Sequence, residues 1–293
     1  YDELHRRYPD KPFLAGEWCA TPTTRGWYAP DDPEKGRVFA GDHDPHNGFS
    51  AAREDTAAFV RARTWVAGGF QWVGVEHRGE CKWPRLCSAS GAVDLFLLKK
   101  DAYYQNQTLL RTEPRVHILG HWNAPADGAK IVPVWVYARA DRVELFLNGA
   151  SLGTRDTRDG RHAEWQVPYA PGELRAVGYK EDAPVCEDVR HTTGKPVKLH
   201  LIPVEPDMPL FTCECLDEAG RTVPDAAPYV RFRAEGGVRI LATGSDNADP
   251  IPPAVPERQM YMGQIAVYAR VSASGALIAE ADGLVPARYE IRA

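Results

Sequence analysis

The chain has 293 residues, of which 44% are hydrophobic and 26% are charged, and its formal net charge is −5. These proportions exclude a disordered chain, and an acidic chain lacks the positive field that nucleic-acid binding needs. No apolar run approaches the roughly 18 residues of a membrane span, so we expect neither a nucleic-acid partner nor a membrane partner.

The N-terminal third shows the pattern of an α/β domain. The apolar run Pro12–Gly16 predicts a strand buried on both faces, and Phe70–Val75 predicts a second such strand. A polar, proline-rich segment over about residues 20–50 predicts a functional loop. Ser50 can cap a helix, and Asp101 can cap another. The order strand, helix, strand, helix predicts two βα units of a parallel sheet or a (β/α)8 barrel.

From about residue 115 onward, apolar and polar residues alternate with period two. Val132–Ala138 and Val143–Leu147 read as strands, and Asn148-Gly149 predicts a tight hairpin. The alternation restarts after Gly194-Lys195-Pro196, and we therefore predict two antiparallel immunoglobulin-like β-sandwiches in tandem. The three predicted domains are residues 1–112, 113–195 and 196–293.

Two βα units cannot close a barrel, because two sheet edges would remain unpaired. We therefore expect this chain to be the C-terminal part of a longer protein, whose upstream residues complete the barrel.

The six cysteines contain no CxxC pair and have no histidine at zinc-finger spacing. We therefore predict no metal site, and we expect no cofactor. The chain is not disulfide-dense, which leans toward a reducing compartment such as the bacterial cytoplasm. A periplasmic or secreted location stays open.

Two residues stand where the predicted parallel strands end. Glu17 follows the first apolar run, and Trp72 closes the second. In parallel α/β folds this end of the sheet carries the active site. Position alone leaves Glu17 equally a catalytic or a structural carboxylate, and for Trp72 it favours simple core packing.

Three motifs of the chain resemble one family of enzymes. Tyr8–Glu17 looks like the seventh barrel strand of glycoside hydrolase family 2, and Phe70–Glu80 looks like its eighth. Val143–Gly149 is similar to the sandwich that follows the barrel in bacterial β-galactosidases of this family. The C-terminal domain, with Asp246–Pro250, resembles their further immunoglobulin-like module.

The resemblance implies a retaining exo-β-galactosidase with Glu17 as its nucleophile and Trp72 as the floor of the galactose site. Trp18, Arg25 and Glu80 are further candidates for binding the sugar. The expected substrate is a β-galactoside oligosaccharide or glycoconjugate, and a homo-oligomer fits the sandwiches. The family's acid/base glutamate follows an asparagine, but this chain has no Asn-Glu pair. The fragment alone is therefore expected to be inactive.

Several alternatives stay open. Glu76-His77 replaces the family's usual Asp-Tyr, and Trp18 stands where the family has a small residue, which leaves the sugar uncertain between galactoside, glucuronide and mannoside. A non-catalytic carbohydrate-binding protein is a further alternative. For Arg25 we favour pairing with a nearby acid over lining the cleft. For Glu80 and Asp94 we favour solvated or structural roles over contact with sugar hydroxyls.

Overall fold

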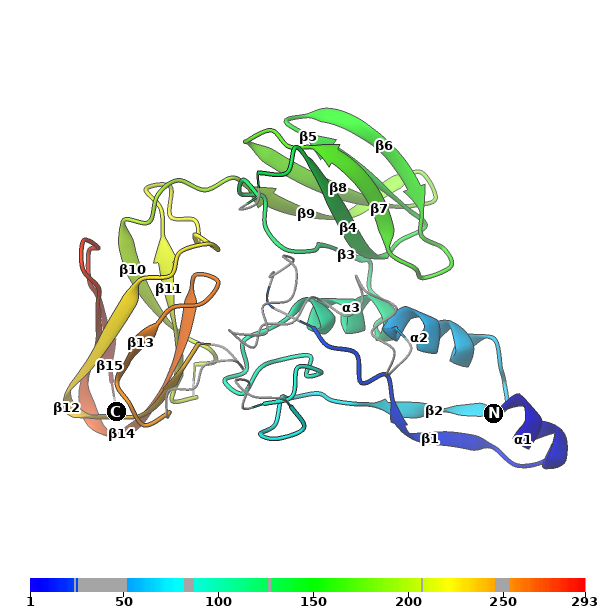
Figure 1. The fold of residues 1–293 in the computed structure, drawn as a ribbon, viewed down its shortest axis with the longest axis horizontal. Helices are drawn as coiled ribbons and strands as arrows, with labels where there is room; N and C mark the ends of the chain where they lie inside the picture. The colour runs from blue at the N-terminus through cyan, green and yellow to red at the C-terminus, as the bar shows by residue number, and fades with distance from the viewer. Residues whose placement is uncertain are drawn as a thin grey trace.

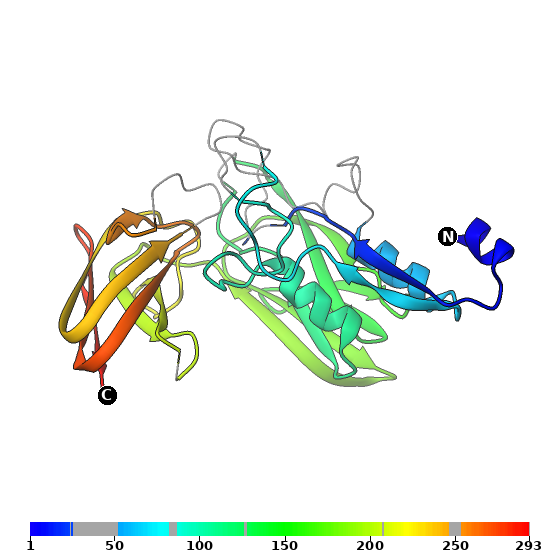
Figure 2. The same cartoon turned by 90° about the horizontal axis from the view of Figure 1, so that it is seen from below.

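The structure is a computed structural model, and it describes residues 1–23, 25, 52–81, 87–125, 128–206, 208–245 and 253–292. Figure 1 shows three parts: an α/β part that contains the N-terminus, a β-sandwich at the top of the view, and a second β part at the left that contains the C-terminus. Figure 2 shows this second β part to one side of the other two. The predicted domain limits stay predictions.

The α/β part confirms the predicted order of strands and helices. Its elements are α1 (Asp2–Arg7), β1 (Phe13–Trp18), α2 (Arg53–Arg61), β2 (Val66–Gln71) and α3 (Asp101–Leu110). β1 and β2 pair in parallel, and α2 is the crossover between them. No closed barrel is present in the described residues. None of the helices there has the length and apolar character that crossing a bilayer requires.

The start of α3 differs from the sequence prediction, and the predicted cap of α2 lies outside the described residues. Asp101 is the first helical residue of α3, and Lys100 occupies the N-cap position. Ser50, the predicted cap of α2, lies outside the described residues, as does most of the predicted loop at about residues 20–50. The described N-cap residue of α2 is Ala52.

The prediction that β1 is buried on both faces is wrong for the described chain. Leu14 on β1 is 58% exposed and Phe70 on β2 is 64% exposed, whereas Ala15 is only 3% exposed. The cause is that this sheet has two strands, so one face lacks a covering layer in the described residues. On the other side, the Trp18 ring lies edge-on to Phe59 of α2, with 6.0 Å between centroids.

The first sandwich consists of a three-stranded sheet in the order β3-β4-β7 and a four-stranded sheet in the order β6-β5-β8-β9. Their inner faces meet in one core around Trp122, Val136 and Leu145, which are at most 1% exposed. The strands are β3 (Arg115–Ile118), β4 (Ile131–Arg139), β5 (Arg142–Leu147), β6 (Ala150–Asp156), β7 (Ala163–Pro168), β8 (Glu173–Lys180) and β9 (Ala183–His191).

The hairpin predicted at Asn148-Gly149 is confirmed. Leu147 of β5 pairs with Ala150 of β6, which leaves a two-residue loop. Both loop residues have positive φ, 50° for Asn148 and 81° for Gly149. These values suit a type I′ turn, whose twist matches that of the flanking strands.

The second β part differs from the predicted sandwich in how its layers connect. Its six strands form one hydrogen-bonded sheet in the order β10-β11-β14-β12-β13, with β15 also paired to β14. Two of these strands are long, with 16 residues in β12 and 17 residues in β14. The strands are β10 (Lys198–Pro203), β11 (Leu210–Leu216), β12 (Tyr229–Gly244), β13 (Glu257–Gln259), β14 (Gln264–Glu280) and β15 (Ala287–Ile291).

Glycines allow β12 and β14 to pass closely where their pairing is irregular. The register shifts between Gly236 and Val238, opposite Gly275. A Cβ on Gly275 would lie 2.1 Å from the backbone oxygen of Glu235, which no side chain can tolerate. The sheet can therefore continue through this irregular step without breaking into two.

The six cysteines are all free thiols, and Cys213 and Cys215 are fully buried. These two lie on the same strand and join the same core, so they do not bond each other. Burial raises the pKa of the Cys215 thiol to about 11. This thiol is therefore protonated at neutral pH and is unreactive.

Candidate active site

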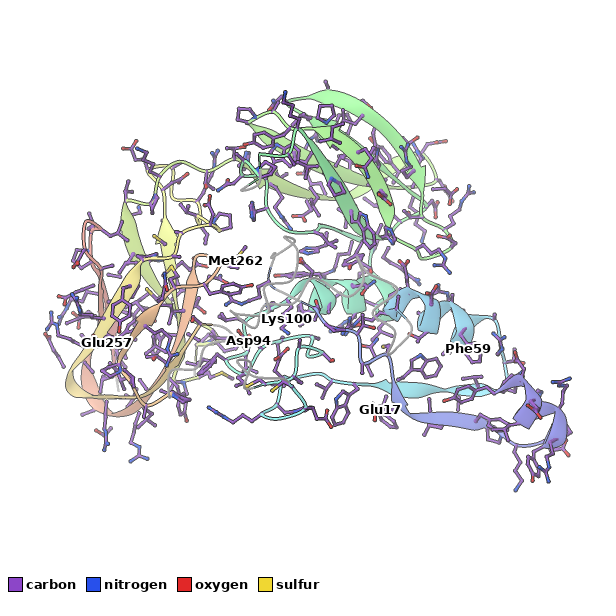
Figure 3. All side chains as sticks on the ribbon, viewed as in Figure 1. Glu17, Phe59, Asp94, Lys100, Glu257 and Met262 are labelled. Carbon is purple, nitrogen blue, oxygen red and sulfur yellow. The ribbon has the colours of Figure 1, made fainter. Side chains whose placement is uncertain are left out.

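Glu17 and Trp72 lie at neighbouring strand ends. Glu17 is the penultimate residue of β1, and Trp72 directly follows β2. The backbone N–H of Trp72 donates to the carbonyl of Trp18 at 2.8 Å. Because the strands are parallel, both residues stand at the carboxyl edge of the sheet, where Figure 3 shows Glu17. Glu17 is exposed there.

A β-bulge places Glu17. Between the pairs Ala15–Gly69 and Trp18–Gln71, β1 contains one more residue than β2, and the extra residue falls at Gly16-Glu17. A bulge bends its strand and changes the direction of a side chain, and bulges are common beside active sites. The register therefore gives Glu17 a local backbone distinct from that of a regular strand.

Trp18 packs on the sheet rather than projecting freely. A Cβ on Gly69 would lie 1.7 Å from the Trp18 ring, so the indole occupies the space above this glycine. The ring also stacks with Tyr1, with 6.3 Å between centroids. The sheet therefore needs glycine at position 69. A sugar-binding role for Trp18 stays a prediction.

Arg25 pairs with an acid, which confirms the preferred interpretation. Its Nε lies 3.5 Å from Oδ2 of Asp94, and the two side chains are only 5% and 4% exposed. Asp94 also accepts hydrogen bonds from the backbone N–H groups of Phe96 and Leu98, at 2.8 and 2.9 Å. Burial raises the pKa of Asp94 above its ordinary value, although Arg25 opposes that rise. Asp94 therefore organises the loop that contains it.

Glu80 lies in the loop that follows β2 and is exposed. Its carboxylate stands 3.5 Å from Nε2 of His77, whose ring lies edge-on to Trp72 with 5.2 Å between centroids. Glu80 therefore reaches the surroundings of Trp72 through His77. A sugar contact of Glu80 stays a prediction.

Lys100 and Glu76 form a buried ion pair that the sequence analysis did not predict. The Lys100 ammonium contacts the Glu76 carboxylate, and their side chains are 4% and 0% exposed. Lys100 also donates to the carbonyls of Thr23 at 3.1 Å and Ala89 at 3.3 Å. Burial lowers the pKa of Lys100, and the charge of Glu76 opposes this effect. Through its hydrogen bond to the carbonyl of Thr23, Lys100 fixes the segment after β1 to the segment after β2.

Arg53 makes a second buried link between the same segments. Its guanidinium donates to the carbonyls of Thr21 at 3.2 Å and Ser90 at 3.1 Å, and the residue is 1% exposed. The partners of Lys100 and Arg53 become visible only in the folded chain.

The arrangement can provide one half of a two-carboxylate site. Glu17 is an exposed carboxylate at a fixed strand end, with the Trp72 indole on the adjacent strand end. A carboxylate so placed can attack an anomeric carbon when a second carboxyl protonates the leaving oxygen. Among the described residues no group of His, Cys, Asp and Glu side chains is arranged to hold a metal ion.

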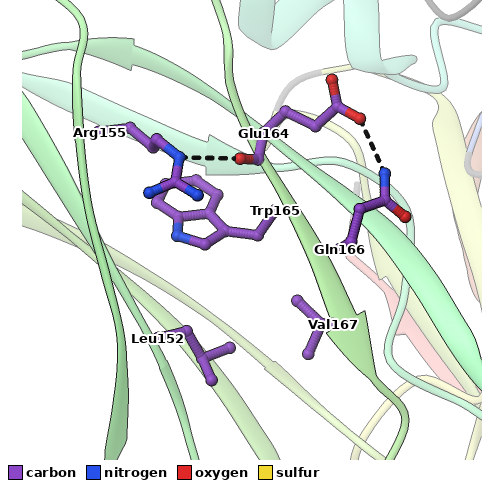
Figure 4. Close-up of a pocket in the computed structure, with 6 residues that line it drawn as sticks. All are labelled: Leu152, Arg155, Glu164, Trp165, Gln166 and Val167. Carbon is purple, nitrogen blue, oxygen red and sulfur yellow. Dashed lines mark hydrogen bonds between the residues drawn. The ribbon is translucent and has the colours of Figure 1, made fainter.

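A pocket of about 430 Å³ lies in the first sandwich, away from this edge. It opens between β6 and β7, and Figure 4 shows its lining residues: Leu152, Arg155, Glu164, Trp165, Gln166 and Val167. The Arg155 guanidinium lies 5.3 Å from the centroid of the Trp165 ring, which is itself only 3% exposed. The indole is therefore not available as a stacking platform for a sugar.

Comparisons with known proteins identify relatives along most of the chain. A β-galactosidase of Bacteroides ovatus, BoGH2A, is 32% identical over 83% of this chain, and a putative β-glucuronidase of Formosa agariphila is 31% identical over 83%. A solved β-glucuronidase from glycoside hydrolase family 2 matches 98% of the chain with a TM-score of 0.77 at 25% identity. The chain belongs to glycoside hydrolase family 2. This agrees with the resemblance seen in the motifs around Glu17 and Trp72.

The family 2 relatives are longer than this chain. It spans 31% of the B. ovatus protein and 28% of the F. agariphila protein. A solved β-glycosidase of Bacteroides vulgatus matches the whole chain with a TM-score of 0.86 and 26% identity, and the match covers 43% of that protein. Residues 129–186, in the first sandwich, also match a family described as a domain of unknown function, DUF4982.

Proposed function

We propose that this chain is part of a retaining exo-β-glycosidase that removes terminal, non-reducing β-D-galactose from oligosaccharides or glycoconjugates. The observation that supports this most strongly is the exposed Glu17 carboxylate at the carboxyl edge of two parallel strands, beside Trp72. Membership of glycoside hydrolase family 2 supports the reaction class.

In the proposed mechanism, Glu17 attacks the anomeric carbon and forms a covalent glycosyl-enzyme, while a second carboxylic acid protonates the departing oxygen. Water then attacks the anomeric carbon and displaces the Glu17 carboxylate, and the second group, now a carboxylate, removes the proton of the water. The nucleophile must be ionised while its partner is protonated, so their environments must differ.

The second carboxyl is proposed to come from an upstream part of a longer polypeptide. This chain contains no Asn-Glu pair of the kind that carries the family's acid/base, and it spans about a third of its relatives. We propose that β1 and β2 are the last two strands of a (β/α)8 barrel. The exposed Leu14 and Phe70 fit a face that further strands would cover. The isolated chain is therefore expected to lack activity.

The identity of the sugar that is removed is a separate part of the proposal. The relatives are named as a β-galactosidase and as β-glucuronidases at similar identity, so a glucuronide is the second candidate. Galactose is favoured by the resemblance of Val143–Gly149 to the sandwich of bacterial β-galactosidases. Aryl β-galactosides and aryl β-glucuronides, compared by kcat/KM on the full-length polypeptide, distinguish the two.

The test of the reaction is Glu17→Gln in the full-length polypeptide. An amide cannot act as the nucleophile, so we expect kcat to fall by at least about 1,000-fold. Glu113→Gln is the matched control, because Glu113 is an exposed glutamate in the segment after α3. Near-normal hydrolysis by Glu17→Gln would defeat the assignment. Sugar binding by residues 111–293 without any hydrolysis by the full-length polypeptide would favour the non-catalytic alternative.

A further inference from the structure

The second β part lies beyond the carboxyl edge of β1 and β2, as Figures 1 and 2 both show. The loop after β2 packs directly against it. Leu98 belongs to one buried cluster with Leu210 of β11 and Ala266 of β14. A Cβ on Gly244 of β12 would lie 1.7 Å from the ring of Phe96, so the ring fills the space at this glycine. The junction is close-packed and apolar.

Arg25 adds a polar clamp to this junction. Its side chain is 5% exposed and bonds to groups from two separate parts of the chain. On one side is the Asp94 carboxylate at 3.5 Å. On the other side are Oε1 of Gln264 at 3.3 Å, the carbonyl of Ser245 and the carbonyl of Tyr261 at 3.4 Å. The guanidinium also lies 5.2 Å from the centroid of the Tyr261 ring.

These contacts suit a structural clamp better than a sugar-binding residue. A guanidinium has five donors in a planar fork, and here protein acceptors and an aromatic face surround it. With 5% of the side chain exposed, little of Arg25 remains for a ligand. A buried arginine also needs its partners, because the loss of one leaves another polar group buried and unpaired.

Arg25 and Asp94 lie in the two segments that follow the strands of the proposed site. Arg25 lies in the segment that follows β1, which contains Glu17, and Asp94 lies in the segment that follows Trp72. The two segments are already joined by the hydrogen bond from Trp72 to Trp18. A shift of the second β part would therefore move both strand-end loops together.

We propose that Arg25 is a positioning residue through which the second β part holds the loops that contain Glu17 and Trp72 in the geometry for glycoside cleavage. The inference rests on the proposed function. It assigns the second β part a role in the site, in addition to its own packing. Arg25 acts through Asp94 and Gln264 and does not touch the sugar.

The experiment combines hydrogen exchange with kinetics on the full-length polypeptide. The variants are Arg25→Ala, Arg25→Lys and Gln264→Ala, where Gln264 lies on the far side of the clamp. Arg288→Ala is the control, because Arg288 forms exposed ion pairs with Glu235 and Glu290 on the outer face of the same part. Exchange is followed by mass spectrometry in peptides that contain Trp72 and Phe96, and kcat and KM are measured with an aryl β-galactoside.

We expect Arg25→Ala and Gln264→Ala to speed amide exchange in both peptides and to lower kcat by about 10- to 100-fold, because displaced catalytic groups slow the chemical step. KM should change less than about threefold, since the sugar loses no direct contact. Arg25→Lys should recover part of the loss by keeping the charge near Asp94. Arg288→Ala should change neither measurement.

The two proposals fail in different ways. If the wild-type polypeptide hydrolyses no glycoside, the proposed function fails, and exchange alone decides whether Arg25 holds the two loops. If Arg25→Ala and Gln264→Ala keep wild-type exchange and wild-type kcat in an active enzyme, the positioning role is overturned. If Arg25→Ala raises KM at unchanged kcat while Gln264→Ala has no effect, Arg25 binds sugar instead.

Discussion

Removing the ammonium of Lys100 should destabilise the α/β part strongly. Lys100→Met keeps the length of the apolar stem but leaves the Glu76 carboxylate buried without its cation. It also removes the donor to the carbonyls of Thr23 and Ala89. Both charged side chains are almost wholly buried, at 4% and 0% exposure, so water cannot replace the lost contact. Breaking a buried pair in this way costs about 3–5 kcal/mol.

The matched control is an exposed pair of the same kind. Arg233 and Glu280 are 55% and 43% exposed, so water replaces the lost contact and Arg233→Met should destabilise far less than Lys100→Met. A double variant, Lys100→Met with Glu76→Leu, removes both charges and should recover much of the loss, because no buried charge is left alone. The recovery separates the cost of an unpaired carboxylate from the loss of packing.

Hydrogen exchange in rising urea measures the local free energy of unfolding of the α/β part. Peptides from β2 and α3 report on this part separately, which is needed because a chain with several parts does not unfold in one step. If Lys100→Met lowers this free energy no more than Arg233→Met does, the pair does not hold the loops together. The reasoning would also be refuted if the double variant were less stable than Lys100→Met alone.

Two further predictions concern contacts between the parts of the chain. Burial raises the pKa of Glu54, but hydrogen bonds from His162 and the charge of Arg161 lower it more, so its pKa lies below 4.5. The ionised Glu54 carboxylate therefore stabilises the contact with His162 above pH 4.5, and this stabilisation is lost as the pH falls through the lowered pKa. Amide exchange around His162 should rise in that pH range. Glu54→Gln should remove this pH dependence. Gly244→Ala should lower the melting temperature, with a cost of about 1–3 kcal/mol from the clash with Phe96. Gly194→Ala, whose Cβ would lie 3.6 Å from Asp217, should change it little, and equal effects of the two variants would contradict the close packing at Gly244.

Elements with a strong local pattern could be predicted from the sequence. The run Pro12–Gly16 predicted β1, and Asn148-Gly149 predicted the hairpin, because each depends on residues close in the chain. The run Phe70–Val75 predicted a second strand too late in the chain, since β2 is Val66–Gln71. β9 was missed. It is an edge strand that has charged residues and no buried residue, so its alternation is weak. The lengths of β12 and β14 could not be predicted, because Gly236 and Gly275 look like strand breaks until the two strands are seen to pair.

The candidate site was predicted in part for the same reason. Glu17 and Trp72 end recognisable strands, so their shared edge followed from parallel pairing. The groups that hold the loops could not be predicted in this way. Arg25 and Gln264 are 239 residues apart in the chain, and the partner of Lys100 is an unremarkable glutamate in a loop. Such pairs are set by the tertiary fold, and no periodicity or spacing marks them.

The most direct test of the proposed function is to trap the sugar on Glu17. An activated 2-deoxy-2-fluoro-β-galactoside allows the covalent step, but its fluorine disfavours the oxocarbenium-like transition state that releases the sugar. After incubation with the full-length polypeptide, peptide mass spectrometry should find one fluorogalactosyl group on the peptide that contains Glu17, together with loss of activity. A label on a different carboxylate, or hydrolysis of galactosides with Glu17 never labelled, would contradict its role as the nucleophile.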